Sequence, residues 1–283
     1  MSVNNLRFII IICFYNAREY IRECVDSVLL QTHSNWLAVC MDDHSDDGSS
    51  TLIPDDPRII KRYNEKRMFT LQNNYNAIVN IGIDYADDDV ICILDGDDKF
   101  LHPYTLEIVH SCFQEYPNCL LTFGQYISSF GRLGHCRPYS EWEFQQLRRT
   151  DYRASHLKAF KWKLYREFLN QDRDLNSYKD SKGNFYPAIS DVALMLPLME
   201  IAGYGNIRFI KHPIYWYRKY DGNTLIDNKP LQKEIDLSIR SKPKFKQAFS
   251  SPPGSKPRIY YAIRRIYWLI KEILISAKHA DKR

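Results

Sequence analysis

Residues 90–98 read Val-Ile-Cys-Ile-Leu-Asp-Gly-Asp-Asp, a short apolar run that ends in three carboxylates within four residues. An apolar run without polar alternation is typical of a strand covered on both faces, as in a parallel sheet. Ligands bind at the carboxyl edge of such sheets. Carboxylates crowded there repel one another unless a cation neutralises them, so the stretch predicts either a Mg²⁺ or Mn²⁺ site or a solvated acidic turn.

The residues before this stretch alternate between strand-like and helix-like patterns. Short apolar runs cover Arg7–Phe14, Trp36–Met41 and Arg58–Tyr63, and the spacing of apolar residues predicts helices over Ala17–Gln31 and Phe69–Tyr85. This β-α-β order predicts an α/β fold with a largely parallel sheet and crossover helices.

The pattern becomes less regular after residue 101. A helix over Leu106–Glu115 and a strand over Leu120–Tyr126 are expected, followed by a helix over Ser190–Ile201 that Pro197 limits or kinks. Nothing repeats, and one large domain with a small appendage fits a chain of 283 residues.

Composition narrows the class of protein further. The chain is 45% apolar, as globular proteins are, and its seven cysteines form no CxxC pair, so reduced and mostly buried thiols are expected. No secretory signal or membrane-spanning run is visible. We therefore expect a cytoplasmic protein, either soluble or peripheral on the inner face of a membrane.

Positive charge is concentrated at the C-terminal end. Residues 231–283 hold 13 lysines and arginines against 4 acidic residues, whereas residues 1–230 hold 26 against 30, which disfavours a nucleic-acid groove in the main domain. Residues 256–278 have the pattern of a basic amphipathic helix with Tyr and Trp. Such a helix would pack on the main domain or on a second subunit, or lie on an anionic membrane surface.

Four short motifs occur in order between residues 13 and 98. They are Cys-Phe-Tyr-Asn at 13–16, Ser-Val-Leu-Leu-Gln-Thr at 27–32, Met-Asp-Asp-His-Ser-Asp-Asp-Gly-Ser at 41–49 and Leu-Asp-Gly-Asp-Asp at 94–98. Together they resemble the motifs of family 2 glycosyltransferases, which have the GT-A fold, use nucleotide-sugar donors and invert the anomeric centre.

The resemblance implies a donor site, with a UDP-sugar as the favoured donor. Tyr15 would lie against the base, and Asp43 would accept a hydrogen bond from the uracil ring. The positions that match donor contacts of the family are Cys13, Tyr15, Asn16, Asp43, Arg67, Asn73, Asp95 and Gly96.

The resemblance also implies a divalent metal ion and a catalytic base. Asp95, Asp97 and Asp98 would hold Mn²⁺ or Mg²⁺, which stabilises the departing nucleoside diphosphate. The base deprotonates the acceptor hydroxyl and is assigned to Asp191. An aspartate near the start of a helix can also be a cap, and that alternative stays open.

Three positions depart from the family pattern. Cys13 stands where proline or threonine is usual, and Ser190 stands where an acid precedes the base. No histidine follows Tyr217-Arg218, so Arg218 or Lys219 is a candidate for supplying positive charge to the diphosphate, unless this stretch is a plain surface loop.

The resemblance implies a glycosyltransferase domain over residues 1–230 and a basic helical extension over 231–283. The nucleotide-binding half would cover about 1–100 and the acceptor half about 101–230. Aromatic residues in Tyr139–Asp174 either stack on acceptor sugars or belong to the core. They are Trp142, Tyr152, Trp162 and Tyr165.

The expected function is inverting transfer of a sugar to an acceptor hydroxyl in glycan or polysaccharide biosynthesis. The acceptor would be a glycan or a lipid-linked or protein-linked molecule, and no nucleic-acid partner is expected. Two alternatives remain: a haloacid-dehalogenase-like phosphatase with Asp95 as nucleophile, and an inactive sugar-nucleotide-binding or scaffold protein.

Overall fold

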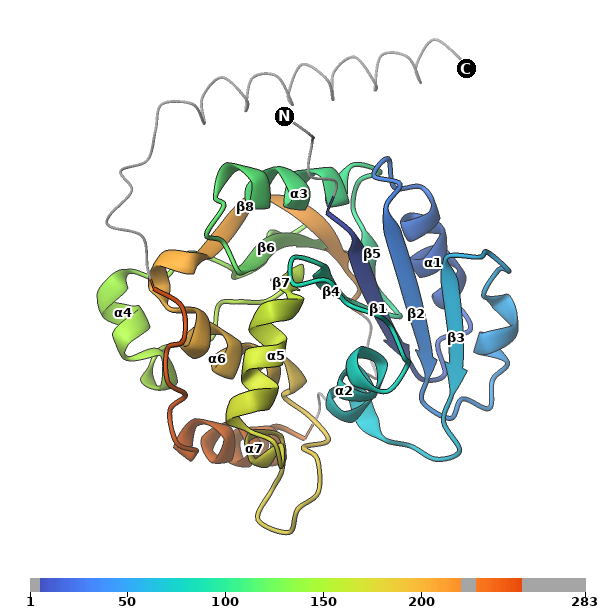
Figure 1. Cartoon of the computed structure of the whole chain (residues 1–283). Coiled ribbons are helices and arrows are strands. Elements are labelled where there is room, and N and C mark those ends of the chain that lie inside the picture. Colours follow the sequence, from blue (N-terminus) through green and yellow to red (C-terminus); the bar gives the residue numbers. More distant parts are fainter. Residues whose placement is uncertain (1–5, 220–227, 251–283) are drawn as a thin grey trace. The chain divides into compact units, whose positions relative to one another are not determined.

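One sheet runs through the part of the chain that this computed structural model describes, residues 6–219 and 228–250 (Figure 1). Its strands are β1 (Phe8–Phe14), β2 (Trp36–Asp42), β3 (Ile59–Tyr63), β4 (Val90–Asp95), β5 (Lys99–Phe100), β6 (Leu121–Ser128), β7 (Lys158–Lys161) and β8 (Ile207–Tyr217). They lie in the order β3-β2-β1-β4-β7-β6-β8-β5. The pairs among β1 to β4 and the pair β6–β8 are parallel, whereas β7 and β5 pair antiparallel with their neighbours. The fold is therefore the expected GT-A-like mixed, mostly parallel sheet.

Helices cover both faces of this sheet (Figure 1). The α-helices are α1 (Ile21–Leu29), α2 (Phe69–Val79), α3 (Thr105–Glu115), α4 (Glu141–Gln145), α5 (Trp162–Gln171), α6 (Ser190–Ala202) and α7 (Lys229–Ser241). Short 3₁₀ turns occur at Ser49–Leu52, Leu147–Arg149, Asn176–Tyr178 and Tyr204–Asn206. The sequence pattern predicted α1, α2, α3 and α6 but not α4, α5 or the 3₁₀ turns, and most of α7 falls in the extension that was expected to be helical from residue 231.

The continuous apolar runs are explained by the two layers of helices. Successive residues of a strand point to opposite faces. In β1, Ile9 and Ile11 belong to a core formed with α2, α5 and α6, whereas Phe8, Ile10 and Ile12 belong to a second core formed with α1 and α3. Because each face is covered, every position in the strand is apolar.

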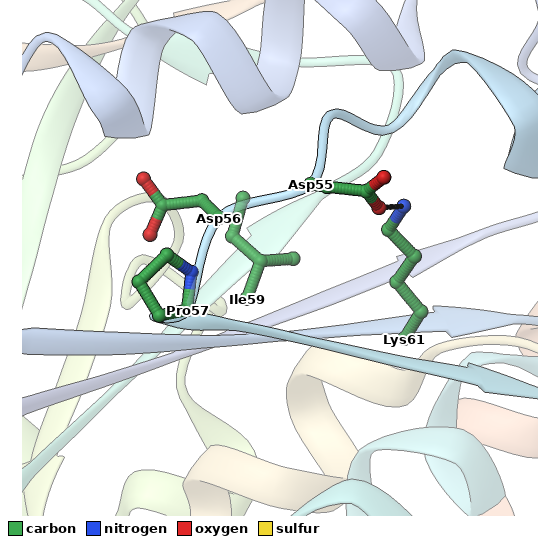
Figure 2. A pocket seen from close by; sticks show the side chains of 5 residues that line it. All are labelled: Asp55, Asp56, Pro57, Ile59 and Lys61. Atoms are coloured by element: carbon green, nitrogen blue, oxygen red, sulfur yellow. Dashed lines mark hydrogen bonds and ion pairs between the residues drawn. The ribbon is translucent and has the colours of Figure 1, made fainter.

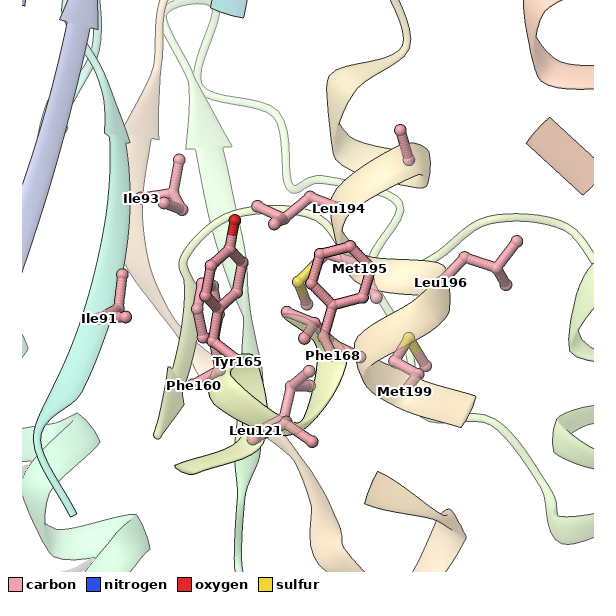
Figure 3. Close-up of a cluster of buried hydrophobic side chains, with 14 of the residues drawn as sticks. Ile91, Ile93, Leu121, Phe160, Tyr165, Phe168, Leu194, Met195, Leu196 and Met199 are labelled. Carbon is pink, nitrogen blue, oxygen red and sulfur yellow. The ribbon is translucent and has the colours of Figure 1, made fainter. Parts of the chain in front are cut away.

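Figure 3 shows the first of these cores, where α5 lies between β4 and α6. Tyr165 and Phe168 of α5 are fully buried there, near Ile93 and Leu194. Tyr165 is therefore a core residue and not an acceptor-stacking one. Helix α6 is buried from Val192 to its last residue and continues through Pro197, so this proline does not end it.

One expected boundary differs from the observed one. Helix α2 ends at Val79, not at Tyr85, because Gly82 adopts a positive φ of 80° that breaks the helix. The chain divides into Met1–Ser251 and Pro252–Arg283, and the domain boundary expected at residue 230 stays a prediction. The helix expected over 256–278 lies outside the described residues.

Helix α7 belongs to the first of these two units. Ile235 and Ile239 on its apolar face are buried. Arg148 donates to the carbonyl oxygen of Ile239 at 3.0 Å and pairs with Glu200 of α6 at 2.7 Å. These contacts place residues 229–241 in the same packed unit as the sheet. No helix in the described ranges is long and apolar enough to cross a membrane.

Candidate active site

The carboxyl ends of three central strands meet at one edge of the sheet. Phe14 at the end of β1 pairs with Asp42 of β2, and Cys13 pairs with Asp95 of β4. The loops that follow these strands therefore start side by side. They carry three of the four sequence motifs, those at 13–16, 41–49 and 94–98.

Gly96 allows the acidic loop to turn directly against β1. Its N–H donates to the carbonyl oxygen of Cys13 at 3.0 Å. A Cβ at this position would lie 2.4 Å from the Cβ of Phe14 and 3.1 Å from the Cys13 carbonyl oxygen. A larger residue would push the loop away from the strand, so the motif needs glycine here for steric reasons.

The carboxylate of Asp43 is buried at the end of β2 and accepts several hydrogen bonds. The backbone N–H groups of Met68 and Phe69 donate to it at 2.7 and 3.0 Å, and the Asn64 amide donates at 3.0 Å. Asn64 also donates to Oδ1 of Asn73 at 2.6 Å. This network fixes the residues before α2 beside the end of β2.

Arg67 connects the Asp43 carboxylate to the ring of Tyr15. Its Nε lies 3.0 Å from Oδ2 of Asp43, and its guanidinium carbon lies 3.3 Å from the centre of the Tyr15 ring. The Tyr15 side chain is 43% exposed. One face of this ring is thus covered by a cation, while the side chain remains open to solvent.

Two other predicted donor contacts are held by the protein itself. The Asn16 side chain exchanges hydrogen bonds with Asp46, donating at 2.9 Å and accepting at 3.0 Å, which ties the loop after β1 to the loop after β2. Asn73 is 1% exposed, and its Nδ2 has no hydrogen-bond partner in the described part of the chain. Both residues shape the walls of the site.

The acidic loop and His156 form a compact group of potential metal ligands. Ligand atoms of Asp95, Asp98 and His156 all lie within 4.8 Å of one another. Asp98 is buried and accepts hydrogen bonds from the Tyr215 hydroxyl at 2.8 Å and from the Arg218 backbone N–H at 2.7 Å. The backbone oxygen of Asp97, the half-buried member of the motif, accepts from Arg218 Nε at 2.7 Å.

The electrostatics of this group favour a cation. Burial, together with the charges of Asp191 and Asp97, raises the pKa of Asp95 to about 6 against the pull of Lys158. Burial and the charges of Asp97 and Asp95 raise the pKa of Asp98 well above its usual value. Because a bound cation would relieve this repulsion, and carboxylate oxygens suit Mn²⁺ or Mg²⁺, the carboxylates of this loop would fit a divalent metal.

His156 was not predicted from the sequence. Its ring stacks on Tyr215 with centroids 4.5 Å apart and on Tyr217 at 5.4 Å, both from β8. Burial, followed by the charge of Lys158, lowers the pKa of His156 to about 3, so its imidazole is neutral at physiological pH. A neutral imidazole is the form that binds metal ions.

Asp191 lies in the first turn of α6 and accepts a hydrogen bond from the ammonium group of Lys158. Lys158 is the first residue of β7, with a side chain only 1% exposed, and its Nζ is 3.4 Å from Nδ1 of His156. Burial, the largest influence, favours a raised pKa for Asp191, but the charge and hydrogen bond of Lys158, together with the two neighbouring histidines, outweigh it and hold the pKa below its usual value. The N-cap of α6 is Ile189, so the capping alternative for Asp191 is not supported.

Comparison with known proteins identifies the family. The sequence profile described as Glycosyl transferase family 2 matches residues 9–173, more than half of the chain. The chain belongs to glycosyl transferase family 2. The match covers β1 to β7 and includes the acidic loop, His156 and Lys158, but ends before Asp191.

Individual relatives match parts of this family 2 chain. It is 35% identical over 88 residues to the putative teichuronic acid biosynthesis glycosyltransferase TuaG of Bacillus subtilis, covering 30% of this chain and 34% of TuaG. Protein CgeD of the same species is 29% identical over 128 residues, covering 41% of this chain and 28% of CgeD. The chain thus spans about a third or less of the length of these relatives.

A solved structure shares the fold. Residues 1–349 of S. aureus TarS, crystallised in complex with UDP-GlcNAc, align with a TM-score of 0.56 and 17% sequence identity. The alignment covers 78% of this chain and 61% of that chain. At this identity the likeness establishes the GT-A-like fold of the family 2 chain and nothing finer.

The remaining charged candidate at the acidic loop is Arg218. Its side chain pairs with Glu23 of α1 at 2.6 Å and lies over the Tyr20 ring at 4.3 Å. Arg218 therefore connects the acidic loop of this glycosyltransferase to α1, and its positive charge is already paired with Glu23. Lys219 is exposed and bonds Ser129 through its backbone N–H at 3.0 Å.

The aromatic acceptor candidates are scattered. The Tyr152 hydroxyl donates to the backbone oxygens of Ala154 at 2.6 Å and Asp191 at 3.2 Å, which places it beside the candidate base. Trp162 stacks on Tyr85 at 4.3 Å, and Trp142 on α4 is 68% exposed. Of these residues, Tyr152 is the one in contact with Asp191.

A separate surface hollow lies near the start of β3 (Figure 2). It is lined by Asp55, Asp56, Pro57, Ile59 and Lys61. Because it lies where the edge strand β3 begins and the acidic motifs follow the ends of β1, β2 and β4, this hollow is not part of the candidate active site.

Proposed function

We propose that this family 2 glycosyltransferase is an inverting, metal-dependent enzyme that transfers a sugar from a nucleotide sugar, with UDP-sugar favoured, to an acceptor hydroxyl. The observation that carries the proposal is the convergence of the acidic loop and Asp191 through His156 and Lys158. His156 lies 3.7 Å from Asp95, and Lys158 binds Asp191. The carboxylates proposed to bind the donor's metal ion and the carboxylate proposed to deprotonate the acceptor therefore lie in one connected group of side chains.

Several observations support a uridine nucleotide as the donor. The exposed ring of Tyr15 and the carboxylate of Asp43 lie at the carboxyl edge of the sheet, where nucleotides bind in such folds. TarS, which shares the fold, was crystallised with UDP-GlcNAc. The name of TuaG refers to teichuronic acid biosynthesis, and we propose a related role in glycan or polysaccharide assembly for this chain.

In the proposed reaction, Asp95, Asp97 and Asp98 would hold Mn²⁺ or Mg²⁺. When bound, the ion stabilises negative charge on the departing nucleoside diphosphate. The hydroxyl oxygen of the acceptor attacks the anomeric carbon, and the bond from that carbon to the diphosphate breaks. Asp191 accepts the proton of the hydroxyl in the same step. Lys158 keeps Asp191 ionised and oriented, so the carboxylate is in the basic form before the acceptor arrives.

The test is calorimetric titration of UDP into the purified full chain, with Mn²⁺ and with EDTA. We expect binding that needs the metal and is lost in Asp97→Ala. Asp191→Asn is the matched control, because the donor site should bind UDP normally when the base is removed. Failure to bind UDP under either condition would overturn the uridine assignment, and GDP and other nucleoside diphosphates would then be titrated.

Family membership argues against the phosphatase alternative. The inactive-scaffold alternative makes a different prediction from ours. A scaffold would bind UDP, but neither hydrolysis nor transfer of any UDP-sugar would depend on Asp191. Measuring UDP-sugar turnover in the wild type and in Asp191→Asn therefore separates the two.

A further inference from the structure

A second cluster of potential metal ligands lies at the opposite end of β1 from the active site. His33 comes from the loop between α1 and β2, and Glu107 and His110 lie one turn apart on α3. His33 Nε2 bonds to the carbonyl oxygen of Leu6, just before β1 begins. His33 and His110 are buried, and Glu107 is half-buried.

The hydrogen bond to Leu6 fixes how His33 presents its other nitrogen. A carbonyl oxygen can only accept, so Nε2 must carry the hydrogen in that 2.9 Å bond. In neutral His33, Nδ1 is then an acceptor, yet it faces Oε1 of Glu107 at 3.4 Å. A metal ion between these two acceptor atoms would be bound by both of them.

Two of the three pairs of side chains lie near the spacing of a tetrahedral metal site, each measured to a different oxygen of the Glu107 carboxylate. Zn²⁺ bonds of about 2.0–2.1 Å at tetrahedral angles put neighbouring ligand atoms about 3.3 Å apart. The observed separations are 3.4 Å from His33 Nδ1 to Glu107 Oε1 and 3.7 Å from His110 Nδ1 to Glu107 Oε2. All three ligand atoms can be chosen within 4.8 Å of one another.

The chemistry of the ligands also points to zinc. Two imidazoles and one carboxylate form a softer set than the carboxylate-rich acidic loop, and such a set prefers Zn²⁺ to Mg²⁺. Metal-binding histidines commonly donate their second ring N–H to a backbone carbonyl, as His33 does to Leu6. A proton alone would require neither the second histidine nor the helical spacing of Glu107 and His110.

We propose that His33, Glu107 and His110 bind a Zn²⁺ ion, with water in the fourth position. The ion joins α3 to the segment before β1 and to the loop before β2. It is a structural site, separate from the donor site, because its ligands lie at the amino end of β1 and the acidic loop lies at the carboxyl end.

The experiment measures Zn²⁺ binding to the EDTA-treated full chain in excess Mg²⁺, which occupies carboxylate sites. We expect one tightly bound Zn²⁺ per chain by metal analysis after dialysis. Glu107→Gln and His110→Gln should each weaken it more than about 100-fold, since loss of a mere supporting hydrogen bond already costs about 10–100-fold. Asp97→Ala should retain it.

Co²⁺ provides a second readout, because tetrahedral Co²⁺ with histidine ligands absorbs visible light far more strongly than octahedral Co²⁺ among carboxylates. Unchanged UDP binding in Glu107→Gln and His110→Gln would show that the variants are folded. Wild-type protein without tight Zn²⁺, or variants that bind it as tightly as wild type, would overturn the site. Neither result bears on the transferase proposal, which is tested by UDP titration.

Discussion

Lys158 donates a hydrogen bond to Asp191 and thereby joins the start of β7 to the first turn of α6. The same ammonium group is attracted by Asp95, and burial would otherwise lower its pKa. Since the net effect is a raised pKa, Lys158 remains charged. One buried cation thus stands between the candidate base and the candidate metal-binding loop.

Replacing Lys158 with methionine should shift the pH dependence of transfer. Without the ammonium group, burial raises the pKa of Asp191, and the base is ionised only at higher pH. The acidic limb of the kcat profile should therefore move to higher pH, with a lower kcat at pH 7. Transfer rates across pH 5–9 would measure it.

Lys163→Met is the matched control for this prediction. Lys163 forms a comparable ion pair with Asp88 at 2.9 Å, but its side chain is more exposed and lies away from Asp191. Its removal should leave the pH profile unchanged. Identical profiles for Lys158→Met and wild type would show that Lys158 does not control the base.

The sequence was sufficient to predict features that are local. The apolar runs of β1, β2 and β4 are contiguous, and the acidic residues follow their ends directly, so the edge where Asp43 and Asp95 meet could be inferred. Contacts such as Lys158 with Asp191 depend on tertiary packing between distant segments. The four-residue strand β7 begins and ends with lysine, so no apolar run marked it.

Some of the missed site had a weak signal. His156 and Lys158 are two residues apart, which is the period that places side chains on one face of a strand. A lysine and a potential metal ligand at that spacing could have been matched to the acidic loop. The donor contact predicted for Asn16 stays a prediction, and the motif alone did not reveal that its side chain bonds Asp46.

Asp191→Asn should separate binding from catalysis. Asparagine keeps the size of the side chain but cannot accept the proton, so kcat should fall by about 10²–10⁴-fold. UDP affinity should stay within about twofold of wild type, because Asp191 is absent from the Asp43 and Tyr15 contacts described above. Steady-state transfer and calorimetry measure the two effects, and a variant with normal kcat would exclude Asp191 as the base.

Asp95 should make the stability of the metal-free protein depend on pH. Its pKa is about 6 in the folded state and about 3.9 in the unfolded chain, so the folded state binds the proton more tightly. The stability that this group contributes is therefore complete below about pH 4 and is lost as the pH rises through 6, by roughly 3 kcal/mol over the whole range. Urea unfolding of EDTA-treated protein at pH 5 and pH 7 measures it.

Asp95→Asn isolates that contribution, because asparagine does not titrate. The difference in unfolding free energy between wild type and Asp95→Asn should grow from pH 5 to pH 7, with the variant relatively more stable at pH 7. Mn²⁺ should also raise the wild-type melting temperature more at pH 7 than at pH 5. A difference that stays constant with pH would contradict the raised pKa.

Gly96→Ala should damage both stability and donor binding. The new methyl group would lie 2.4 Å from the Cβ of Phe14, so the acidic loop must move away from β1. Overpacking of this kind costs about 1–3 kcal/mol. Because Asp95 and Asp97 flank Gly96, metal-dependent UDP binding should weaken by at least about tenfold, as calorimetry would show.

Gly82→Ala is the control that separates the general cost of replacing a glycine from the specific displacement of the acidic loop. Gly82 has a φ of 80°, and a Cβ there would meet nothing within 4 Å. Alanine should therefore cost about 1–2 kcal/mol through backbone strain alone, while UDP affinity remains that of the wild type. If Gly96→Ala lost only as much stability as Gly82→Ala and bound UDP normally, the close approach of the acidic loop to β1 would not be what positions the metal-binding carboxylates.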